Sequence, residues 1–363
     1  MRPGSPQPGR EAARRRLAVK WGAVTAIVGM TLAVGALSGC GGAASGASSL
    51  TITLYSGQHE QTTDSLVAGF EKATGIKVSV RNDDEDTLAD DIVNEGSHSP
   101  ADVIFTENSQ VLEFLQGKGL LTKVDASTLA HTPAKYNSPQ GDWVGVSGRV
   151  SVLIYNPALI SESQLPTSVL QLADPKYKGK LAIAPQETDF QPIVTAVEQA
   201  YGQAKALSWL DGVKANAGSH NYPDNETIAD EVNRGSAAFG IVNQYYWYRM
   251  SAELGAANTK AKIAYFAAGD PGYVVDVSGA AILKSSKHQA AAQKFLAYLV
   301  STQAQEVIAN PKESISFEYP IASGVTTQAG ETPFAQLQPY SISIGELGTG
   351  TAAISLMREA GLL

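Results

Sequence analysis

Residues 50–107 read LTITLYSGQHEQTTDSLVAGFEKATGIKVSVRNDDEDTLADDIVNEGSHSPADVIFTE and decide the fold. Three short runs within them, residues 50–55, 76–80 and 101–106, have the apolar and β-branched pattern that is typical of strands. Between these runs, apolar residues recur at helical spacing, and Gly75 ends the first helix. The order strand, helix, strand, helix, strand predicts the start of a doubly wound α/β sheet.

Polar side chains follow two strands of this predicted sheet. His59 comes after the first strand and Glu107 directly follows the third. In open α/β sheets, ligands bind in the crevice outside the carboxyl ends of the strands. We therefore expect these two side chains to face the same crevice.

A pair of tyrosines stands at an equivalent place later in the chain. Residues 237–242 (AAFGIV) predict a buried strand, and Tyr245 and Tyr246 come just after it. A phenol has a pKa of about 10, but a trivalent metal ion stabilises the phenolate enough to remove its proton at neutral pH. Two phenols, a carboxylate and an imidazole at strand ends together indicate a metal site. The alternative is an aromatic cluster that packs beneath a loop.

The N-terminal segment differs from the rest of the chain. The arginines at 14–16 make a basic start, residues 21–39 carry no charge, and the only cysteine, Cys40, follows. This pattern resembles a bacterial lipoprotein signal peptide over residues 1–39, although a plain transmembrane anchor is the alternative. The arginine run also hints at twin-arginine export. Residues 40–49 predict a flexible tether, so we expect an exported protein, anchored by lipid on Cys40 to the outer face of the cell membrane.

Charge and motifs exclude several functions. Six of the 27 Lys and Arg and one of the 35 Asp and Glu precede Cys40, which leaves 21 basic and 34 acidic residues and a formal charge of −13. An acidic surface argues against nucleic acid as a partner. His59 and Glu60 begin like a zinc-protease helix, but Thr63 stands where the second histidine would be. There is no nucleophile elbow and no phosphate-binding loop motif. We therefore expect a binding protein rather than an enzyme.

The remaining pattern predicts a second α/β set. Residues 144–155 form a long predicted strand that passes from one lobe to another, and residues 274–277 are its expected return partner. Further elements are expected as a strand at 279–283, a helix starting near Pro166, and helices at 190–201, 204–213, 226–233, 289–300 and 352–362. The acidic residues 83–86 are interpreted as capping and first-turn charges of a helix, with a cation site as the alternative.

From about Leu50 to the C-terminus, the chain resembles the periplasmic ferric-ion-binding proteins of bacterial ABC transporters. The stretches that carry this resemblance are LYSGQHE, EGSHSPADVIFTEN, WVGVSGRVSVLIYNP, VNQYYWYRM and DPGYVVDVSGAAILKSSKH. The resemblance implies a type II periplasmic-binding-protein fold, in which crossover strands join two α/β lobes. Lobe 1 is expected to hold residues 50–148 and 276–326, and lobe 2 residues 149–275 and 327–363. The resemblance also implies a monomer that closes over Fe(III) and docks on a membrane permease driven by a separate ATPase.

The resemblance implies a specific set of iron ligands. His59 and Glu107 would come from one lobe, and Tyr245 and Tyr246 from the other. Ferric iron is a hard ion that prefers anionic oxygen, which this set supplies. In the family, water or a small anion such as phosphate or carbonate fills the two remaining octahedral positions. Positions assigned to the anion or to support behind the ligands are Gln58, Asn108, Arg149, Asn225 and Asn243. Arg149 would balance negative charge or bridge the lobes.

One loop departs from the family pattern. Glu187, Thr188 and Asp189 stand where family members that hold phosphate have a small Ser-Gly-Ala-like loop. Carboxylates there would repel an anion. We hypothesise that the site uses water or carbonate, or that Glu187 or Asp189 itself approaches the metal. The alternative is that Thr188 or Asp189 caps the following helix.

Two other functions stay open. The same fold could bind a polyamine or another organic cation in an aromatic and acidic pocket, with Tyr245, Trp247 and the acidic residues 83–86. An exported metallohydrolase would instead use His59, Glu107 and Asp189 with a divalent metal.

Overall fold

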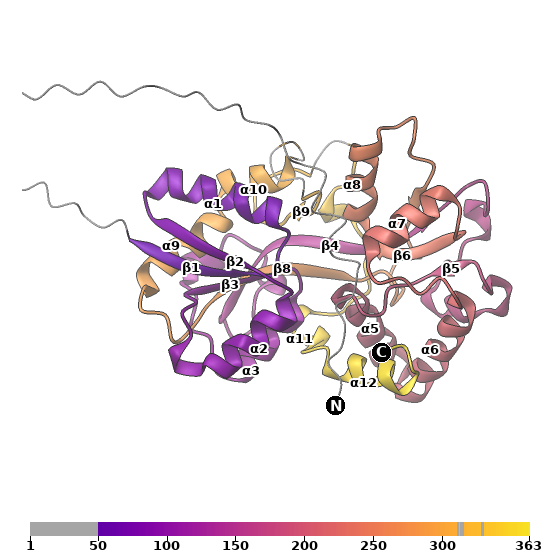
Figure 1. The fold of residues 1–363 in the computed structure, drawn as a ribbon, viewed down its shortest axis with the longest axis horizontal. Coiled ribbons are helices and arrows are strands. Elements are labelled where there is room, and N and C mark those ends of the chain that lie inside the picture. The colour runs from indigo at the N-terminus through magenta and orange to yellow at the C-terminus, as the bar shows by residue number, and fades with distance from the viewer. Residues whose placement is uncertain (1–49, 311, 313–315, 328–329) are drawn as a thin grey trace, which may run out of the picture. The chain divides into compact units, whose positions relative to one another are not determined.

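The computed structural model describes residues 50–310, 312, 316–327 and 330–363 (Figure 1). The expected signal peptide, the tether and Cys40 lie outside the described residues. Within the described part of the chain, no helix has both the length and the apolar character needed to cross a membrane.

The first three strands form the parallel sheet that the sequence predicts. β1 (Thr51–Ser56) lies between β2 (Lys77–Asn82) and β3 (Val103–Thr106) and is parallel to both. The helices that follow these strands are α1 (Glu60–Thr74), α2 (Glu85–Glu95) and α3 (Ser109–Gly117). Gly75 ends α1 in the left-handed conformation, at φ 72°, which glycine adopts without strain.

Helices cover both faces of this sheet. Successive side chains of a strand point to opposite faces. Val103 and Phe105 of β3 belong to the buried cluster that α1, α9 (Gln289–Leu299) and α10 (Thr302–Ala309) line. Ile104, between them, belongs to the cluster lined by α2 and α3. The doubly wound arrangement expected for this region is confirmed.

Two strands continue the sheet into the second half of the fold (Figure 1). β8 (Val275–Ile282) is antiparallel to β3 and to β4 (Trp143–Tyr155). At Val150 and Ser151, the partner of β4 changes from β8 to β6 (Phe239–Asn243). The strand order is β2-β1-β3-β8-β4-β6-β5. The remaining strands are β5 (Leu181–Ala182), which is parallel to β6, and β7 (Lys262–Ala264) and β9 (Tyr319–Pro320), which pair with β4.

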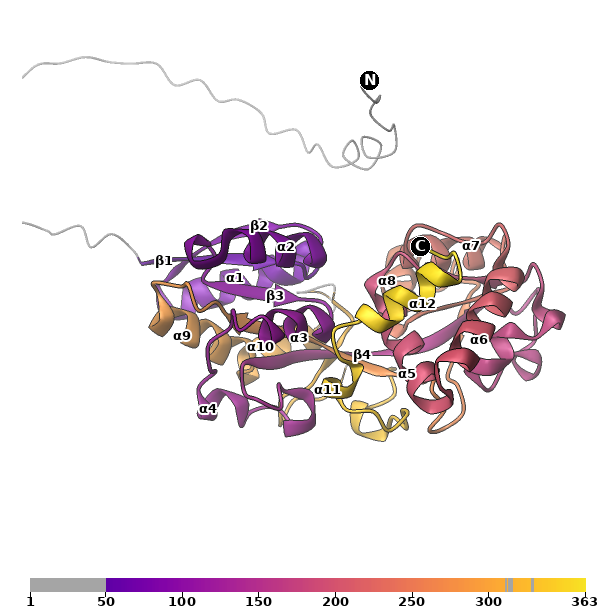
Figure 2. The same ribbon diagram turned by 90° about the horizontal axis from the view of Figure 1, so that it is seen from below.

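The second half has its own helices around β4, β6 and β5 (Figure 2). Four of them agree with the expected positions to within a few residues: α5 (Gln191–Tyr201), α6 (Gln203–Ala217), α7 (Asn225–Arg234) and α12 (Thr351–Glu359). The sequence pattern missed α3 and α10, as well as α4 (Ala126–Leu129), α8 (Gln244–Leu254) and α11 (Ile344–Leu347).

Two expectations are wrong. The segment near Pro166 forms short 3-10 helices rather than an α-helix, and Pro175 lacks the backbone N–H that a helix running through it would need. Residues 274–277 and 279–283 are not separate strands but largely one, β8. Its Gly279 marks the close approach of α3, since an added Cβ would lie 2.6 Å from Leu112 Cδ1.

The acidic run before α2 is only partly as expected. Glu85 and Asp86 lie in the first turn of the helix, where negative charge is favourable. Asp84 occupies the N-cap position, but its side chain makes no cap hydrogen bond.

Candidate metal centre

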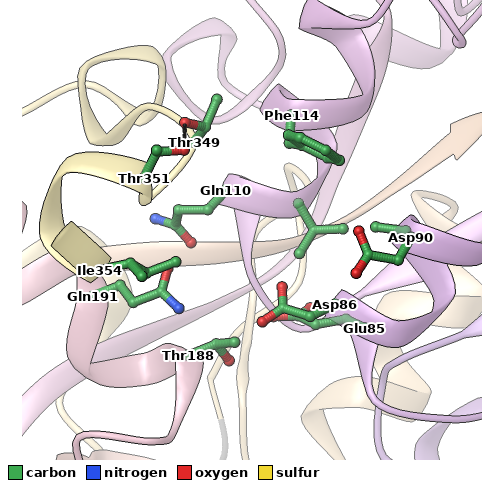
Figure 3. A pocket seen from close by; sticks show the side chains of 12 residues that line it. Glu85, Asp86, Asp90, Gln110, Phe114, Thr188, Gln191, Thr349, Thr351 and Ile354 are labelled. Atoms are coloured by element: carbon green, nitrogen blue, oxygen red, sulfur yellow. Dashed lines mark hydrogen bonds between the residues drawn. The ribbon is translucent and has the colours of Figure 1, made fainter. Parts of the chain in front are cut away.

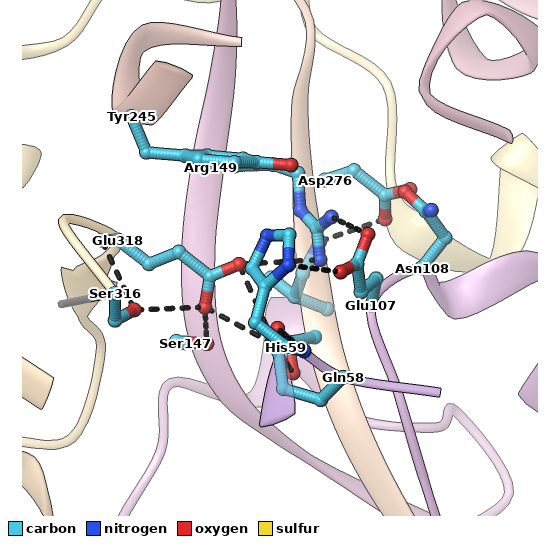
Figure 4. A network of polar contacts seen from close by, with 12 residues as sticks. Gln58, His59, Glu107, Asn108, Ser147, Arg149, Tyr245, Asp276, Ser316 and Glu318 are labelled. Carbon is cyan, nitrogen blue, oxygen red and sulfur yellow. Dashed lines mark hydrogen bonds and ion pairs between the residues drawn. The ribbon is translucent and has the colours of Figure 1, made fainter. Parts of the chain in front are cut away.

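His59 and Glu107 meet at the carboxyl end of the parallel sheet, as expected. β1 and β3 are neighbours, so the residues that follow them converge. His59 Nδ1 lies 3.1 Å from Glu107 Oε1, and both side chains are largely buried (Figure 4). The other ring nitrogen of His59, Nε2, is buried and has no hydrogen-bond partner among the described residues. Such an arrangement leaves one nitrogen available as a metal ligand while a carboxylate orients the ring.

Burial lowers the pKa of His59 well below its usual value, and the guanidinium groups of Arg249 and Arg149 lower it further. The imidazole is therefore neutral at physiological pH. A neutral imidazole is the form that binds a metal ion.

Tyr245 and Tyr246 lie in the first turn of α8, directly after β6. Both are buried, and their ring centroids lie 4.1 Å apart. The ring of His59 meets that of Tyr245 edge-on at a centroid distance of 5.6 Å. The structure therefore brings both phenols to the crevice that holds His59 and Glu107.

Asp189 joins the two phenols. The hydroxyls of Tyr245 and Tyr246 both donate to Asp189 Oδ2, at 3.3 and 3.1 Å, and the amide of Asn225 donates to the same oxygen at 3.1 Å. Burial raises the pKa of both tyrosines well above the usual value, and the Asp189 carboxylate raises it further. In the absence of a cation, both phenols are protonated and act as donors.

The capping interpretation of this loop is wrong. Thr188 and Asp189 belong to a 3-10 helix, Thr188–Phe190, that precedes α5, and neither helix has a side-chain cap hydrogen bond. Thr188 Oγ1 instead accepts from Asn108 Nδ2 at 2.7 Å, and Asp189 turns to the tyrosines. Half-buried Glu187 has a pKa raised to about 8, first by burial and then by the nearby Asp189 carboxylate.

Arg149 supplies the buried positive charge of the cluster. It lies on β4 with 1% of its side chain exposed, and Nη1 is 3.4 Å from Asp189 Oδ1 and 3.9 Å from Glu107 Oε2. Nη2 lies 3.6 Å from Glu318 Oε1 on the far side (Figure 4). Two roles were expected for Arg149, the balance of negative charge and a bridge between the lobes. Its contacts support charge balance, because the guanidinium lies between three carboxylates.

Two of the expected support residues do not enter the cluster. The amide nitrogen of Gln58 points away from it, to Ser278 and Glu318, while its oxygen accepts from the backbone of His59 at 2.8 Å. Gln58 therefore holds the His59 backbone from behind. Asn243 lies at the end of β6 opposite Ser151, and no hydrogen bond described for this part of the chain joins its side chain to the ligand cluster.

Sequence reasoning missed Arg249. Its guanidinium lies over the rings of Tyr245 and Tyr246, at 5.3 and 5.8 Å from their centroids, and pairs with Glu226 at 3.1 Å. A signal was present, because a residue four positions after Tyr245 lies on the same face of a helix. Glu318 was also missed, and no local pattern pointed to it.

The metal-binding capacity of the cluster depends on its phenols as well as its carboxylates. Among the described residues, no group of three or more His, Cys, Asp or Glu side chains is arranged to hold a metal ion. The cluster of His59, Glu107 and Asp189 with Tyr245 and Tyr246 offers one nitrogen and several oxygens from both halves of the sheet. Carboxylate and phenolate oxygens are hard ligands, which suit a small, highly charged cation.

Comparisons with known proteins point the same way. The family model described as "Bacterial extracellular solute-binding protein" matches residues 98–332. The chain is 38% identical to the Fe(3+)-binding periplasmic protein of Serratia marcescens, over 86% of this chain and 90% of that protein. It is 34% identical to the major ferric iron-binding protein of Neisseria meningitidis serogroup B, over 86% and 93%. The crystal structure of iron-bound HitA from Pseudomonas aeruginosa superposes with a TM-score of 0.81 at 38% identity, covering 86% of this chain and 99% of that one.

Proposed function

The chain belongs to the bacterial extracellular solute-binding proteins that include the periplasmic ferric-iron-binding proteins, and from this premise we propose that it captures Fe(III) outside the cytoplasm for import by an ABC transporter. The fold is the two-lobed periplasmic-binding-protein fold of that family. The observation that carries the proposal is the meeting of two buried phenols with His59 Nε2 and Glu107.

His59, Glu107, Tyr245 and Tyr246 are the proposed iron ligands. Ferric iron would displace the two phenol protons and turn both hydroxyls from donors into anionic ligands. His59 Nε2 has no competing partner among the described residues, and its neutral ring needs no deprotonation. Arg149 and Arg249 would limit the excess negative charge of the phenolates and carboxylates.

Asp189 is the proposed replacement for a separate anion. Its Oδ2 already lies within 3.3 Å of both phenol oxygens, so a cation shared by the two phenolates would also touch this carboxylate. Arg149 and Asn225, which would otherwise hold an anion, instead contact Asp189. This geometry favours the hypothesis that Asp189 approaches the metal over one in which phosphate or carbonate fills the position.

Capture depends on closure of the two lobes. The proposed boundaries are residues 50–148 with 276–326 and residues 149–275 with 327–363. The change of pairing partner on β4 at Val150 and Ser151 supports the first boundary. His59 and Glu107 belong to the first proposed lobe and the two tyrosines to the second. Iron bound to all four would make contacts that the open form lacks, so it would favour the closed form. Lipid on Cys40 would hold the protein, as a monomer, near the permease and its ATPase.

The test is a titration of the metal-free protein with a ferric chelate, followed by visible absorption. We expect a phenolate-to-iron charge-transfer band that saturates at one iron per protein. Tyr245→Phe and Tyr246→Phe should each weaken the band, while Tyr201→Phe, at a side chain that is 41% exposed, should leave it unchanged. A folded protein without the band would overturn the proposal and favour an organic cation at the same crevice.

A further inference from the structure

A pocket of roughly 240 Å³ lies beside the proposed iron site (Figure 3). Its walls come from α2 and α3 on one side and from the starts of α5 and α12 on the other. These elements belong to different halves of the fold, so a molecule in the pocket would contact both. The residues used below are Asp86 and Asp90 of α2, Gln110 and Phe114 of α3, and Ile354 of α12.

The pocket has negative charge and no positive charge in its lining. Asp86 and Asp90 are one helical turn apart, and Glu85 lines the wall beside them. Like charges at this spacing destabilise a helix. Of the described residues that line the pocket, none is Lys or Arg. A bound cation would relieve this repulsion.

Gln110 offers unused hydrogen-bonding capacity at the same place. It is 4% exposed, and neither its amide nitrogen nor its amide oxygen has a hydrogen-bond partner among the described residues. Gln110 lowers the pKa of the nearby Asp276 carboxyl, which burial raises, but neither of its amide atoms reaches hydrogen-bond geometry with that carboxylate. Buried amides are rarely left unpaired, so this side chain indicates a polar ligand.

The rest of the lining indicates what kind of cation fits. Phe114, Val111 and Ile354 form an apolar part of the wall, which favours a hydrocarbon body. An aromatic ring also attracts a cation over its face. A cavity of this size is larger than a bare metal ion needs. We propose that the pocket is a second ligand site, which binds a small organic ammonium ion through Asp86, Asp90 and Gln110.

The geometry connects this site to the iron site. Glu85 Oε2 accepts the backbone N–H groups of Glu107 and Asn108, at 2.8 and 3.0 Å. Thr188, also in the lining, is hydrogen-bonded to Asn108 and precedes Asp189. An ammonium ion that holds both walls should therefore tighten iron binding, and iron should tighten ammonium binding by the same factor. This linkage rests on the proposed function, whereas the site itself does not.

Calorimetric titration of the metal-free protein with n-butylammonium and with 1,4-butanediammonium tests the site. We expect saturable binding of at least one of them, with one equivalent per protein. The double variant Asp86→Asn, Asp90→Asn and the single variant Gln110→Leu should each bind at least tenfold more weakly. Gln110→Leu keeps the buried volume and removes only amide atoms without partners, so it should fold. Asp64→Asn, an exposed carboxylate on α1 away from the pocket, is the matched control.

Four outcomes would count against the site. No binding of either ammonium ion at 10 mM, on the order of the weakest useful affinity, would overturn it. Tighter binding of K⁺ or Mg²⁺ than of the ammonium ions would also overturn it. So would an ammonium affinity of Gln110→Leu equal to that of the unmodified chain. Tyr245→Phe and Tyr246→Phe should leave ammonium binding intact. If they abolish it, the ammonium ion occupies the proposed iron crevice and the pocket is not a site. Ammonium binding without any iron charge-transfer band would leave the site standing and overturn the proposed function alone.

Discussion

The hydroxyl of Tyr246 donates a hydrogen bond to Asp189 Oδ2 at 3.1 Å, which joins the start of α8 to the turn before α5. This contact places a carboxylate of the chain beside the phenols, where we propose that it replaces a small anion. Arg149 fixes the carboxylate from the other side, with Nη1 at 3.4 Å from Oδ1. If Asp189 is a ligand of the metal, as proposed, no separate anion is needed at this position.

Substitution Asp189→Gly removes this carboxylate and leaves space for an anion. We expect the ferric affinity to fall at least tenfold in buffer free of added anions, which corresponds to about 1.4 kcal/mol per factor of ten. Added bicarbonate should restore part of the loss, because Arg149 and Asn225 remain to hold an anion. The measurement is a competition titration against a chelator of known affinity.

The control for Asp189→Gly is Asp174→Asn, which alters a half-exposed carboxylate paired with Lys176 at the surface. It should leave the affinity unchanged. Unaltered iron binding by Asp189→Gly without added anion would show that Asp189 is not a ligand.

Arg249 is expected to assist iron capture through its charge. Its guanidinium lies over both phenol rings, and a positive charge there favours the phenolates. We expect Arg249→Gln to weaken ferric binding roughly tenfold, about 1.4 kcal/mol, and Arg249→Lys to weaken it less. Arg234→Gln removes an exposed arginine that pairs with Asp230 and Glu231 and serves as the control. Equal affinities for Arg249→Gln and Arg234→Gln would rule out this role.

The meeting of His59 and Glu107 could be predicted because strand ends are local features. The apolar and β-branched pattern of residues 50–55 and 101–106 locates two strands, and parallel neighbours place His59 and Glu107 together. The tyrosines follow the same rule at β6, where the partner strand is antiparallel β4. For Tyr245 and Tyr246, the prediction came from the chemistry of the phenols and not from the strand topology.

The features that could not be predicted have a different physical origin. The direction of the Gln58 side chain depends on Ser278 and Glu318, which are more than 200 residues away in the sequence. Contacts at such separations follow from the packing of strands, not from any local period. The expected helix near Pro166 is replaced by short 3-10 helices, and Pro175 lacks the backbone N–H that would continue a helix through it. The expected strands 274–277 and 279–283 are largely one strand, β8, in which Gly279 allows α3 to approach closely.

Glu187 should make the stability of the metal-free protein depend on pH. Its pKa is about 8 in the folded chain, because of burial first and then the Asp189 carboxylate, against 4.5 for an ordinary glutamate. Since the folded pKa is raised, its contribution is fully present below pH 4.5 and is lost as the pH rises through 8. A single proton gives a slope of at most about 1.4 kcal/mol per pH unit.

The variant Glu187→Gln should flatten that part of the profile. We expect its free energy of unfolding, measured in urea at several pH values between about 5 and 8, to fall less steeply with pH than that of the unmodified chain. Glu162→Gln, which changes an exposed carboxylate in the second half of the fold, should keep the original slope. Identical profiles for Glu187→Gln and the unmodified chain would contradict the assignment.

We expect β8, which continues the sheet from one half of the fold to the other, to tolerate a larger residue at Gly279 poorly. An added Cβ would lie 2.6 Å from Leu112 Cδ1 and 3.1 Å from the carbonyl oxygen of Val144, with β4 on one side and α3 on the other. Overpacking of a closed interface typically costs about 1–3 kcal/mol, so Gly279→Ala should lower the free energy of unfolding by that amount. Gly117→Ala, at the end of α3, is the matched control because no atom lies within 4 Å of its added Cβ. It should be neutral or stabilise the protein by up to about 1 kcal/mol. Equal urea midpoints for the two variants would mean that α3 can move away from β8 at little cost.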